Sequence, residues 1–423
     1  MGFRGQSSLV SQAAILCGGL GTRLRPYTEL VPKPMVEVAG RPFLEHLLDQ
    51  ISQEGVRRFV LMTGYMGDQI RSYFGDGSEW GWEVTYCHGP IDWQTGRRLV
   101  EASDDLDPSF LLLYSDNWAD LDLLALENSH RSGGGAVTVT LVGRDGGNVL
   151  FEGGPLVEAY DPSRTGERLD HVEIGYAIIE KALVIERLEA VEGSPDIGFD
   201  VVLESLAATG DLGGHLLGGS HRSISDPERL KLTREFFDDR RVLLIDRDGT
   251  INRKASPGEY VATWSEFVFI PETVEAMRIL AGDGFEFVVI TNQAGIALGV
   301  VDAQDVDRIH ERMSEALSDI GVEVRGIYLS PDHWEAGSSS RKPAPGMFYA
   351  ASEDHRFRLD RVLYVGDDVR DCEAAVNAGC GMVFLDDRDD HGDLPINRRH
   401  CSVHRSLLDA VEQIRDYYGV GSD

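Results

Sequence analysis

The chain has 423 residues, of which 42% are hydrophobic and 26% are charged, a composition typical of a globular protein rather than a disordered one. This length exceeds what one hydrophobic core usually serves, so we expect two domains. With 71 acidic and 40 basic residues the formal net charge is −31, which argues against binding to nucleic acid or to an anionic membrane.

The five cysteines are scattered without a CxxC pair, so we predict neither a disulfide framework nor a zinc knuckle. The first residues are polar, and no stretch of about 18 apolar residues could span a bilayer. We therefore expect a cytoplasmic protein whose residues 1–12 are disordered. The sequence gives no indication of the oligomeric state.

A glycine-rich turn follows the first apolar run, residues 13–16. It reads Cys-Gly-Gly-Leu-Gly-Thr-Arg-Leu, and Val-Pro-Lys-Pro-Met follows a few residues later. Glycines let backbone N–H groups approach phosphate oxygens, and nearby basic side chains add positive charge. A glycine-rich turn alone is often only structural. The combination predicts a nucleotide-phosphate site made of Gly18, Gly19, Gly21, Thr22, Arg23 and Lys33.

These motifs resemble those of the sugar-1-phosphate nucleotidyltransferases, including the mannose-, glucose- and heptose-1-phosphate enzymes. The resemblance implies a Rossmann-like sheet that binds a nucleoside triphosphate, whose α-phosphorus is attacked by a sugar phosphate with release of pyrophosphate. It also implies that Arg23 and Lys33 contact the phosphates. Asp116 follows the apolar run 110–114 and matches the family's metal-binding aspartate, so it is the candidate Mg²⁺ ligand of this half.

Three segments depart from that family. Residues 93–98 read Trp-Gln-Thr-Gly-Arg-Arg where a glycine-rich segment near the base is usual, and Glu173 stands where asparagine is common. Ser223 occupies the position of a second metal carboxylate, with Asp226 three residues further on. The first half could be a transferase of altered specificity or weakened activity, or a nucleotide-sugar sensor that regulates the second half.

The second half opens with Val-Leu-Leu-Ile-Asp-Arg-Asp-Gly-Thr-Ile-Asn at residues 242–252. Four apolar residues predict a buried strand, and two carboxylates follow at its carboxyl end, where ligands bind in open parallel sheets. Asp246 could attack a phosphorus while Asp248 moves the proton. Taken alone, an acidic turn after a strand is weak evidence.

Three further apolar runs of this half each precede a polar side chain that suits a phosphate site, namely Thr291, Lys342 and Asp367. The hydroxyl can hold a phosphate oxygen, and the lysine can offset the charge on a phosphate under attack. The aspartate can hold Mg²⁺ opposite Asp246. Each group by itself has an ordinary structural explanation, whereas the ordered set favours a catalytic one.

The ordered set resembles the haloacid dehalogenase superfamily of phosphatases. Asp-Arg-Asp-Gly-Thr-Ile-Asn, Thr-Asn-Gln-Ala-Gly-Ile-Ala and Arg-Lys-Pro-Ala-Pro-Gly-Met point to the branch of the D-glycero-D-manno-heptose 1,7-bisphosphate and histidinol-phosphate phosphatases. The resemblance implies that Asp246 is the nucleophile that forms an aspartyl-phosphate and that Asp248 acts as acid and then as base. Thr291 and Lys342 would steady the phosphoryl group.

The same resemblance implies a metal site and a substrate site. Mg²⁺ would be held by Asp246, the backbone carbonyl of Asp248 and Asp367, with Asp371 in support. Substrate contacts would come from Asn292, Gln293 and Arg341.

Many members of this branch carry a zinc loop of cysteines and histidines ahead of Arg-Lys-Pro. Here residues 330–340 contain His333 and no cysteine, too few ligands for a closed zinc site. We predict no structural zinc and a loop held by packing, with Trp334 as the candidate and His333 solvated.

Together these patterns predict an α/β protein of two Rossmann-like three-layer domains with mostly parallel sheets, at residues 13–236 and 237–423. The predicted function is bifunctional: a Mg²⁺-dependent phosphatase for heptose bisphosphate, joined to a sugar-1-phosphate nucleotidyltransferase that would activate the product. The alternative is a histidinol-phosphate or other small sugar-phosphate phosphatase beside a degenerate nucleotide-sugar-binding module. In either case the partners are small phosphorylated molecules.

Overall fold

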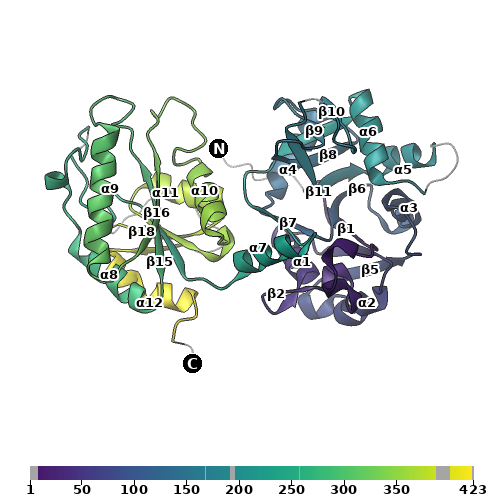
Figure 1. Ribbon diagram of the computed structural model, residues 1–423, viewed down its shortest axis with the longest axis horizontal. Helices are drawn as coiled ribbons and strands as arrows, with labels where there is room; N and C mark the ends of the chain where they lie inside the picture. The colour runs from purple at the N-terminus through teal and green to yellow at the C-terminus, as the bar shows by residue number, and fades with distance from the viewer. Residues whose placement is uncertain (1–7, 167, 191–195, 257, 387–400, 422–423) are drawn as a thin grey trace. The chain divides into compact units, whose positions relative to one another are not determined.

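The computed structural model describes residues 8–166, 168–190, 196–256, 258–386 and 401–421. The chain divides into two compact units, Met1–Arg234 and Glu235–Asp423 (Figure 1). Each unit is an α/β fold with helices on both faces of its main sheet. Over the two main sheets together the parallel pairings predominate, as the sequence predicts, although the sheet of the first unit is mixed. Within the described ranges, no helix is long and apolar enough to cross a membrane.

The start of the chain differs from its prediction where it is described. Residues 1–7 of the segment predicted to be disordered lie outside the described residues. From Ser8 on, the backbone is anchored: the Ser8 hydroxyl and the Val10 N–H both donate to Glu127 Oε1, and Val10 is 2% exposed. The acceptor lies more than a hundred residues away, so local sequence does not reveal this contact.

The first unit is built on a nine-stranded sheet. Its parallel part runs in the order β6-β1-β4-β5 and comprises β1 (Gln12–Cys17), β4 (Arg58–Thr63), β5 (Glu83–His88) and β6 (Ser109–Tyr114). The remaining strands of the sheet are β8 (Val137–Gly143), β9 (Val149–Leu150), β10 (Ala159–Tyr160), β11 (His171–Glu180) and β12 (Leu212–Leu216). β11 pairs antiparallel with β6 and β8. Two ribbons lie beside the sheet, β2 (Glu37–Val38) with β3 (Arg41–Pro42), and β7 (Asn117–Ala119) with β13 (His221–Ser223).

Helices cover both faces of this sheet because the strands are apolar on both sides. One core contains side chains of α1 (Phe43–Gln53), α2 (Gly67–Phe74) and α4 (Leu123–Gly133). The other contains side chains of α3 (Thr95–Glu101), α5 (Lys181–Glu189) and α6 (Phe199–Thr209). α7 (Pro227–Phe237) spans the division between the two units.

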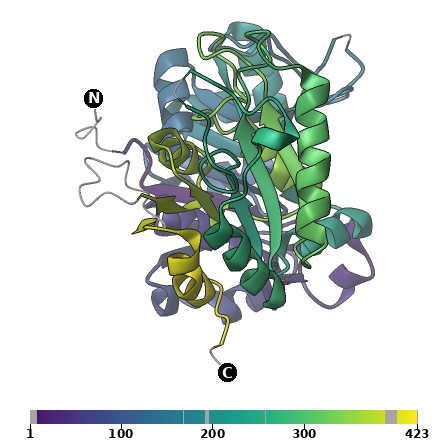
Figure 2. The ribbon, with the colours of Figure 1, turned by 90° about the vertical axis from the view of Figure 1, so that its left-hand side faces the viewer.

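The second unit has a six-stranded sheet in the order β16-β15-β14-β17-β18-β19, with every pairing parallel. The strands are β14 (Val242–Ile245), β15 (Glu286–Asn292), β16 (Val324–Ser330), β17 (Leu363–Gly366), β18 (Gly381–Leu385) and β19 (Cys401–His404). One core packs against α8 (Pro271–Gly282), α9 (Ala303–Ser318) and α12 (Leu407–Tyr417), and the other against α10 (Gly346–His355) and α11 (Val369–Ala378). Figure 2 shows α9, in bright green, lying along the strands of this unit.

Candidate active sites

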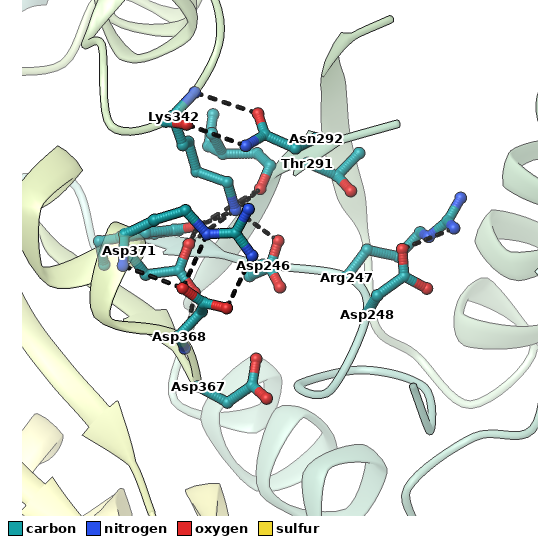
Figure 3. Close-up of polar contacts among 12 residues, drawn as sticks. Asp246, Arg247, Asp248, Thr291, Asn292, Lys342, Asp367, Asp368 and Asp371 are labelled. Atoms are coloured by element: carbon teal, nitrogen blue, oxygen red, sulfur yellow. Dashed lines mark hydrogen bonds and ion pairs between the residues drawn. The ribbon is translucent and has the colours of Figure 1, made fainter. Parts of the chain in front are cut away.

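The second unit brings its predicted catalytic residues to one edge of the sheet (Figure 3). β14 lies between β15 and β17, so the carboxyl ends of these strands are neighbours. Asp246 follows β14, Thr291 lies near the end of β15, and Asp367 follows β17. Lys342 reaches Asp246 from the segment after β16. Tertiary structure thus assembles groups that are up to 121 positions apart in the printed sequence.

Lys342 and Asp246 form a buried ion pair at the centre of this site. Lys342 Nζ lies 2.6 Å from Asp246 Oδ1 and 2.8 Å from Asp371 Oδ1, and it contacts the Tyr364 hydroxyl at 2.7 Å. Burial raises the pKa of Asp246, against the opposing effect of Lys342. Burial works to lower the pKa of Lys342, but the two carboxylates raise it overall. The lysine therefore stays charged and binds one oxygen of Asp246, and the other oxygen lies outside this ion pair.

Asp248 is held by a separate set of donors and does not take part in that ion pair. Its Oδ2 accepts hydrogen bonds from Arg247 Nη2 and Gln293 Nε2, both at 2.7 Å, and its Oδ1 accepts one from Asn252 Nδ2 at 2.9 Å. Burial works to raise the pKa of Asp248, but Arg247 and these hydrogen bonds lower it overall. Arg247 is buried and contacts His310 Nε2 at 2.9 Å. Arg247 and His310 are absent from the residues that the sequence predicts, although the Asp-Arg-Asp motif contains the arginine.

Three carboxylates of this site could hold a cation. One ligand atom each of Asp246, Asp367 and Asp371 lies within 4.8 Å of the others. Asp367 Oδ1 is buried without a hydrogen-bond partner among the described residues, and burial raises the pKa of Asp367. Both oxygens of Asp371 already accept hydrogen bonds, one from Tyr364 and one from the N–H of Asp368. Asp246 and Asp367 therefore fit as ligands of a hard divalent cation such as Mg²⁺, and Asp371 fits as their support.

The turn after Asp248 requires a glycine at position 249. Gly249 has a φ of 97°, and a Cβ there would lie 2.2 Å from Asp367 Oδ2. The same carboxylate oxygen is 2.6 Å from Lys254 Nζ. The glycine of the Asp-Arg-Asp-Gly motif thus lets the β14 turn approach the carboxylate that follows β17.

Two residues predicted to bind substrate hold other parts of the site. Asn292 Nδ2 donates to Lys342 O at 3.1 Å, and Asn292 Oδ1 accepts from Lys342 N at 3.0 Å. Gln293 Nε2 donates to Asp248 Oδ2 and, at 2.9 Å, to Thr291 Oγ1. The structure therefore assigns Asn292 to fixing the lysine backbone and Gln293 to linking two catalytic candidates. Such pairings depend on distant segments, so the motif alone does not show them.

A cavity of about 520 Å³ opens beside Asp248, and Gln293 also lines it. The predicted substrate-binding Arg341 lines this cavity together with Lys254 and Arg370. Lys254 and Arg370 each have a carboxylate partner. Arg341 instead donates from Nη1 to a backbone carbonyl at 3.1 Å, and burial, followed by the nearby Arg370, lowers its pKa. The lining also includes three carboxylates, those of Asp248, Glu259 and Asp368. Among the described residues, Arg341 is therefore the cation of this cavity that an anionic group of a ligand would balance.

The segment 330–340 is held by hydrogen bonds to Asp332. Asp332 Oδ2 accepts from Ser338 Oγ at 2.5 Å, and the carbonyl of Asp332 accepts from the arginine that follows the segment. The prediction that Trp334 holds the loop by packing is wrong, because this side chain is 59% exposed. It stacks on His333 with ring centroids 3.8 Å apart. The Ser338 hydroxyl donates to a carboxylate within the loop. The indole of Trp334 takes no part in these hydrogen bonds and remains exposed to solvent.

In the first unit, a cavity of about 520 Å³ lies over the carboxyl end of β1. Gly21, with a φ of 61°, accepts a hydrogen bond at its carbonyl from Thr28 Oγ1 at 2.9 Å. The structure gathers around this cavity every residue predicted for the nucleotide, together with the predicted metal ligand: Gly18, Gly19, Gly21, Thr22, Arg23, Lys33 and Asp116.

Asp116 has partners that match a phosphate site with one acidic metal ligand. Lys33 Nζ forms an ion pair with Asp116, and Ser225 Oγ donates to it at 3.1 Å. Burial works to raise the pKa of Asp116, but Lys33 lowers it overall. The carboxylate is therefore ionised and available to a divalent cation, since Mg²⁺ needs few protein carboxylates when phosphate oxygens supply other ligands.

Asp226 does not replace the carboxylate that is missing at Ser223. Ser223 is 8% exposed, and its hydroxyl lies 2.6 Å from that of Ser225. Asp226 begins α7, where its Oδ1 accepts from Arg229 N at 2.9 Å and its carboxylate pairs with the Arg229 side chain. Asp226 is the N-cap of this helix. It lies three residues after Ser223 and therefore caps a helix instead of serving as the second metal ligand.

Arg98 lines the first unit's cavity although the sequence does not predict it as a site residue. It is 4% exposed, and a Cβ on Gly18 would lie 2.3 Å from its Cζ. Its guanidinium donates to the carbonyls of Thr63 and Pro90 at 2.8 and 2.7 Å. Burial lowers the pKa of Arg98. A buried guanidinium bonded to neutral carbonyls needs a counter-charge, which the phosphates of a nucleotide would supply.

Comparison with known proteins agrees with both resemblances. Residues 12–148 match the nucleotidyl transferase family, and residues 241–380 match the polynucleotide kinase 3 phosphatase family. The D-glycero-D-manno-heptose-1,7-bisphosphate 7-phosphatase of Chlorobaculum tepidum is 34% identical over 193 residues, which cover 43% of this chain and 95% of that protein. The second half of the chain belongs to this phosphatase family. The corresponding Pseudomonas aeruginosa PAO1 enzyme is 36% identical over 34% of this chain and 81% of its own length.

The first half is similar to a probable glucose-1-phosphate cytidylyltransferase of Bacillus subtilis. The two are 34% identical over 151 residues, which make up 30% of this chain, and the chain spans 59% of that relative's length.

A crystal structure of the D,D-heptose 1,7-bisphosphate phosphatase from B. bronchiseptica, complexed with magnesium and phosphate, aligns with this chain at 30% identity and a TM-score of 0.38. The alignment covers 42% of this chain and 98% of that one. The chain thus joins a first half that is similar to nucleotidyl transferases to a second half of the heptose-bisphosphate phosphatase family, and both predicted resemblances are confirmed.

Proposed function

We propose that the second unit, as its own catalytic domain, is a Mg²⁺-dependent phosphatase that removes the 7-phosphate of D-glycero-D-manno-heptose 1,7-bisphosphate. The observation that carries this proposal is the buried pair of Asp246 and Lys342, with Asp248 held nearby by independent donors. One carboxylate is thereby oriented for attack and the other for proton transfer. The names of the curated relatives of this half support the substrate.

In the proposed reaction the free oxygen of Asp246 attacks phosphorus, and the bond from phosphorus to the sugar oxygen breaks. Asp248 gives a proton to that leaving oxygen. Water then attacks the aspartyl-phosphate, Asp248 takes a proton from it, and inorganic phosphate leaves as the Asp246 carboxylate is restored. The low pKa of Asp248 means that it must gain a proton as substrate binds, which the negative charge of the phosphate favours.

The surrounding groups stabilise the phosphoryl group while these bonds change. Lys342 supplies a fixed positive charge and donates to the carbonyl of Ile290, the residue before Thr291 in β15. The Thr291 hydroxyl would hold a phosphate oxygen at the same strand end. Asp246 and Asp367, with the backbone carbonyl of Asp248, would hold Mg²⁺, and Asp371 would orient Lys342. When bound, the ion would neutralise charge on the phosphate oxygens.

One cation of the cavity beside Asp248 favours a bisphosphate over histidinol phosphate, although carboxylates line the cavity as well. Arg341, Arg370 and Lys254 line that cavity, and the guanidinium of Arg341 bonds only a neutral carbonyl among the described residues. A second phosphate on the sugar would balance this charge. The ammonium group of histidinol would not pair with the Arg341 guanidinium.

We further propose that the first unit transfers a nucleotide to the sugar 1-phosphate that the phosphatase leaves, as two consecutive steps in the cytoplasm. The buried Arg98 and the residues Arg23 and Lys33 make its cavity cationic, which suits a nucleoside triphosphate. Asp116 would hold the accompanying Mg²⁺.

One observation favours a second candidate for the first unit. Ser223 supplies a hydroxyl where a second metal carboxylate is expected, and Asp226 is used as a helix cap. A unit with one acidic ligand could bind nucleotide and regulate the phosphatase without transferring anything.

Two assays test these proposals. Phosphate release with Mg²⁺ is measured from heptose 1,7-bisphosphate, histidinol phosphate and heptose 7-phosphate, and we expect the bisphosphate to have the highest kcat/KM. Preference for histidinol phosphate would reject the proposed substrate. Pyrophosphate release is then measured with sugar 1-phosphates and each nucleoside triphosphate, where nucleotide binding without turnover would favour the regulatory module.

A further inference from the structure

The cavity beside Asp248 contains an aromatic side chain that the loop itself does not need. Trp334 is 59% exposed and lines this cavity. The loop that carries it is fastened through Asp332 to Ser338, so the indole stabilises neither the loop interior nor a hydrophobic core. Its neighbour His333 lies 3.8 Å away between ring centroids and supports it from one side. A large apolar side chain left at the mouth of a ligand cavity is a candidate ligand contact.

A second ring lines the same cavity from another part of the chain. Tyr260 packs so closely on Gly295 that a Cβ there would lie 2.9 Å from the tyrosine ring. Gly295 follows the strand end that carries Thr291 and Gln293. The contact with Gly295 therefore fixes the Tyr260 ring close to the end of β15, where the residues that would hold the phosphoryl group lie.

The cavity thus combines aromatic faces with charged side chains of both signs, among which Arg341 donates to a backbone carbonyl. A cyclic sugar has C–H faces that pack on aromatic rings, and its charged substituent would meet Arg341. An acyclic phosphate ester has the charge without such a face. The rings can therefore distinguish substrates that the cations cannot.

We propose that Trp334, with Tyr260, binds the ring of the sugar bisphosphate and makes the phosphatase selective for cyclic substrates. This inference rests on the proposed phosphatase function and adds a specificity-determining residue to it. Trp334 lines the cavity from a loop that has no cysteine to bind zinc.

The test compares two substrates of matched charge in the full chain with Mg²⁺: D-glycero-D-manno-heptose 1,7-bisphosphate and the acyclic 1,3-propanediol bisphosphate. In Trp334→Ala we expect the KM for the heptose to rise roughly 10-fold, the loss of about one aromatic contact, with kcat within about 2-fold. The KM for the acyclic ester should rise several-fold less. Trp334→Phe should restore most of the difference, because an aromatic face remains.

The controls separate this inference from the function on which it rests. Leu408→Ala removes another exposed apolar side chain, on α12 and outside the residues that line the cavity, and should leave both KM values unchanged. An equal rise for both substrates in Trp334→Ala, or no rise, would overturn the ring contact. A wild-type chain that hydrolyses neither bisphosphate would instead reject the proposed phosphatase function.

Discussion

The candidate sites of the two units have opposite arrangements of charge. In the second unit the carboxylates Asp246 and Asp367 stand at the strand ends, and Lys342 is inserted between Asp246 and its neighbour Asp371. In the first unit the cavity has cations close to the glycine-rich turn, among them Arg98, with a carboxylate of the β6 strand end paired to one of them. A phosphate ester would need a metal ion to approach the carboxylates of the second unit. The cations of the first unit would attract a phosphate directly.

The contrast suggests different uses for the acidic groups of the two sites. A carboxylate that attacks phosphorus must be buried, oriented and close to positive charge, and Asp246 meets these conditions. A carboxylate that only holds the metal of a bound nucleotide can remain paired with a lysine, as Asp116 does. The following variants test this contrast.

Asp246→Asn should have the largest effect. The amide cannot act as the nucleophile, so phosphate release should fall at least about 1,000-fold while pyrophosphate release by the first unit stays within about 2-fold. Asp305→Asn, on the exposed face of α9, is the matched control and should retain both activities. Mg²⁺-dependent phosphate release that persists in Asp246→Asn would contradict the nucleophile assignment.

Ser223→Asp should have an intermediate effect confined to the first unit. A carboxylate beside Ser225 would give Asp116 an acidic partner for Mg²⁺, so the Mg²⁺ concentration that half-saturates pyrophosphate release should fall several-fold. Ser223→Asn, which has the same shape without the charge, serves as control. If the two variants behave alike, the missing carboxylate is not what distinguishes this site.

Glu173→Gln should have the smallest effect and act on stability. In contrast to Asp246, which has a lysine partner, Glu173 accepts from the backbone N–H of Gly175 at 2.8 Å, and burial raises its pKa to about 7 from 4.5. Between these two values the unfolded chain loses the proton that the folded chain keeps, so wild-type stability falls as the pH rises from 4.5 to 7 and then levels off. Glutamine does not titrate.

The free energy of unfolding of the first unit, measured with urea from pH 4 to pH 8, checks this expectation. The advantage of Glu173→Gln over wild type should be absent near pH 4, grow toward pH 7 and reach at most roughly 3 kcal/mol. Glu158→Gln, at an exposed position, should show no such trend. An advantage that is constant across this range would exclude the raised pKa as its cause.

Several site residues could be predicted because their positions follow strand ends. Asp246 and Asp367 come directly after short apolar runs, and parallel strands in one sheet place such ends together. The contacts of Asn292 could not be predicted in this way. Its amide pairs with the backbone of a residue 50 positions away, and a polar side chain next to a phosphate motif looks the same in sequence whether it contacts substrate or chain.

The same limit explains Arg98 and Trp334. Arg98 lies in a segment that departs from the family pattern, and only the fold shows its guanidinium buried against Gly18. Trp334 looks like a packing residue in sequence because indoles are usually buried, yet hydrogen bonds to Asp332 hold its loop.

The amino-acid sequence was enough to predict the two α/β units, their family resemblances and the candidate groups of both sites, because apolar strands, glycine turns and acidic strand ends are local patterns. Only the tertiary structure decided which of those groups pair. It placed Lys342 between two carboxylates and assigned Asp226 to a helix end. Side-chain pairing depends on distances of a few ångströms between segments far apart in the chain, and the local order of residues does not contain those distances.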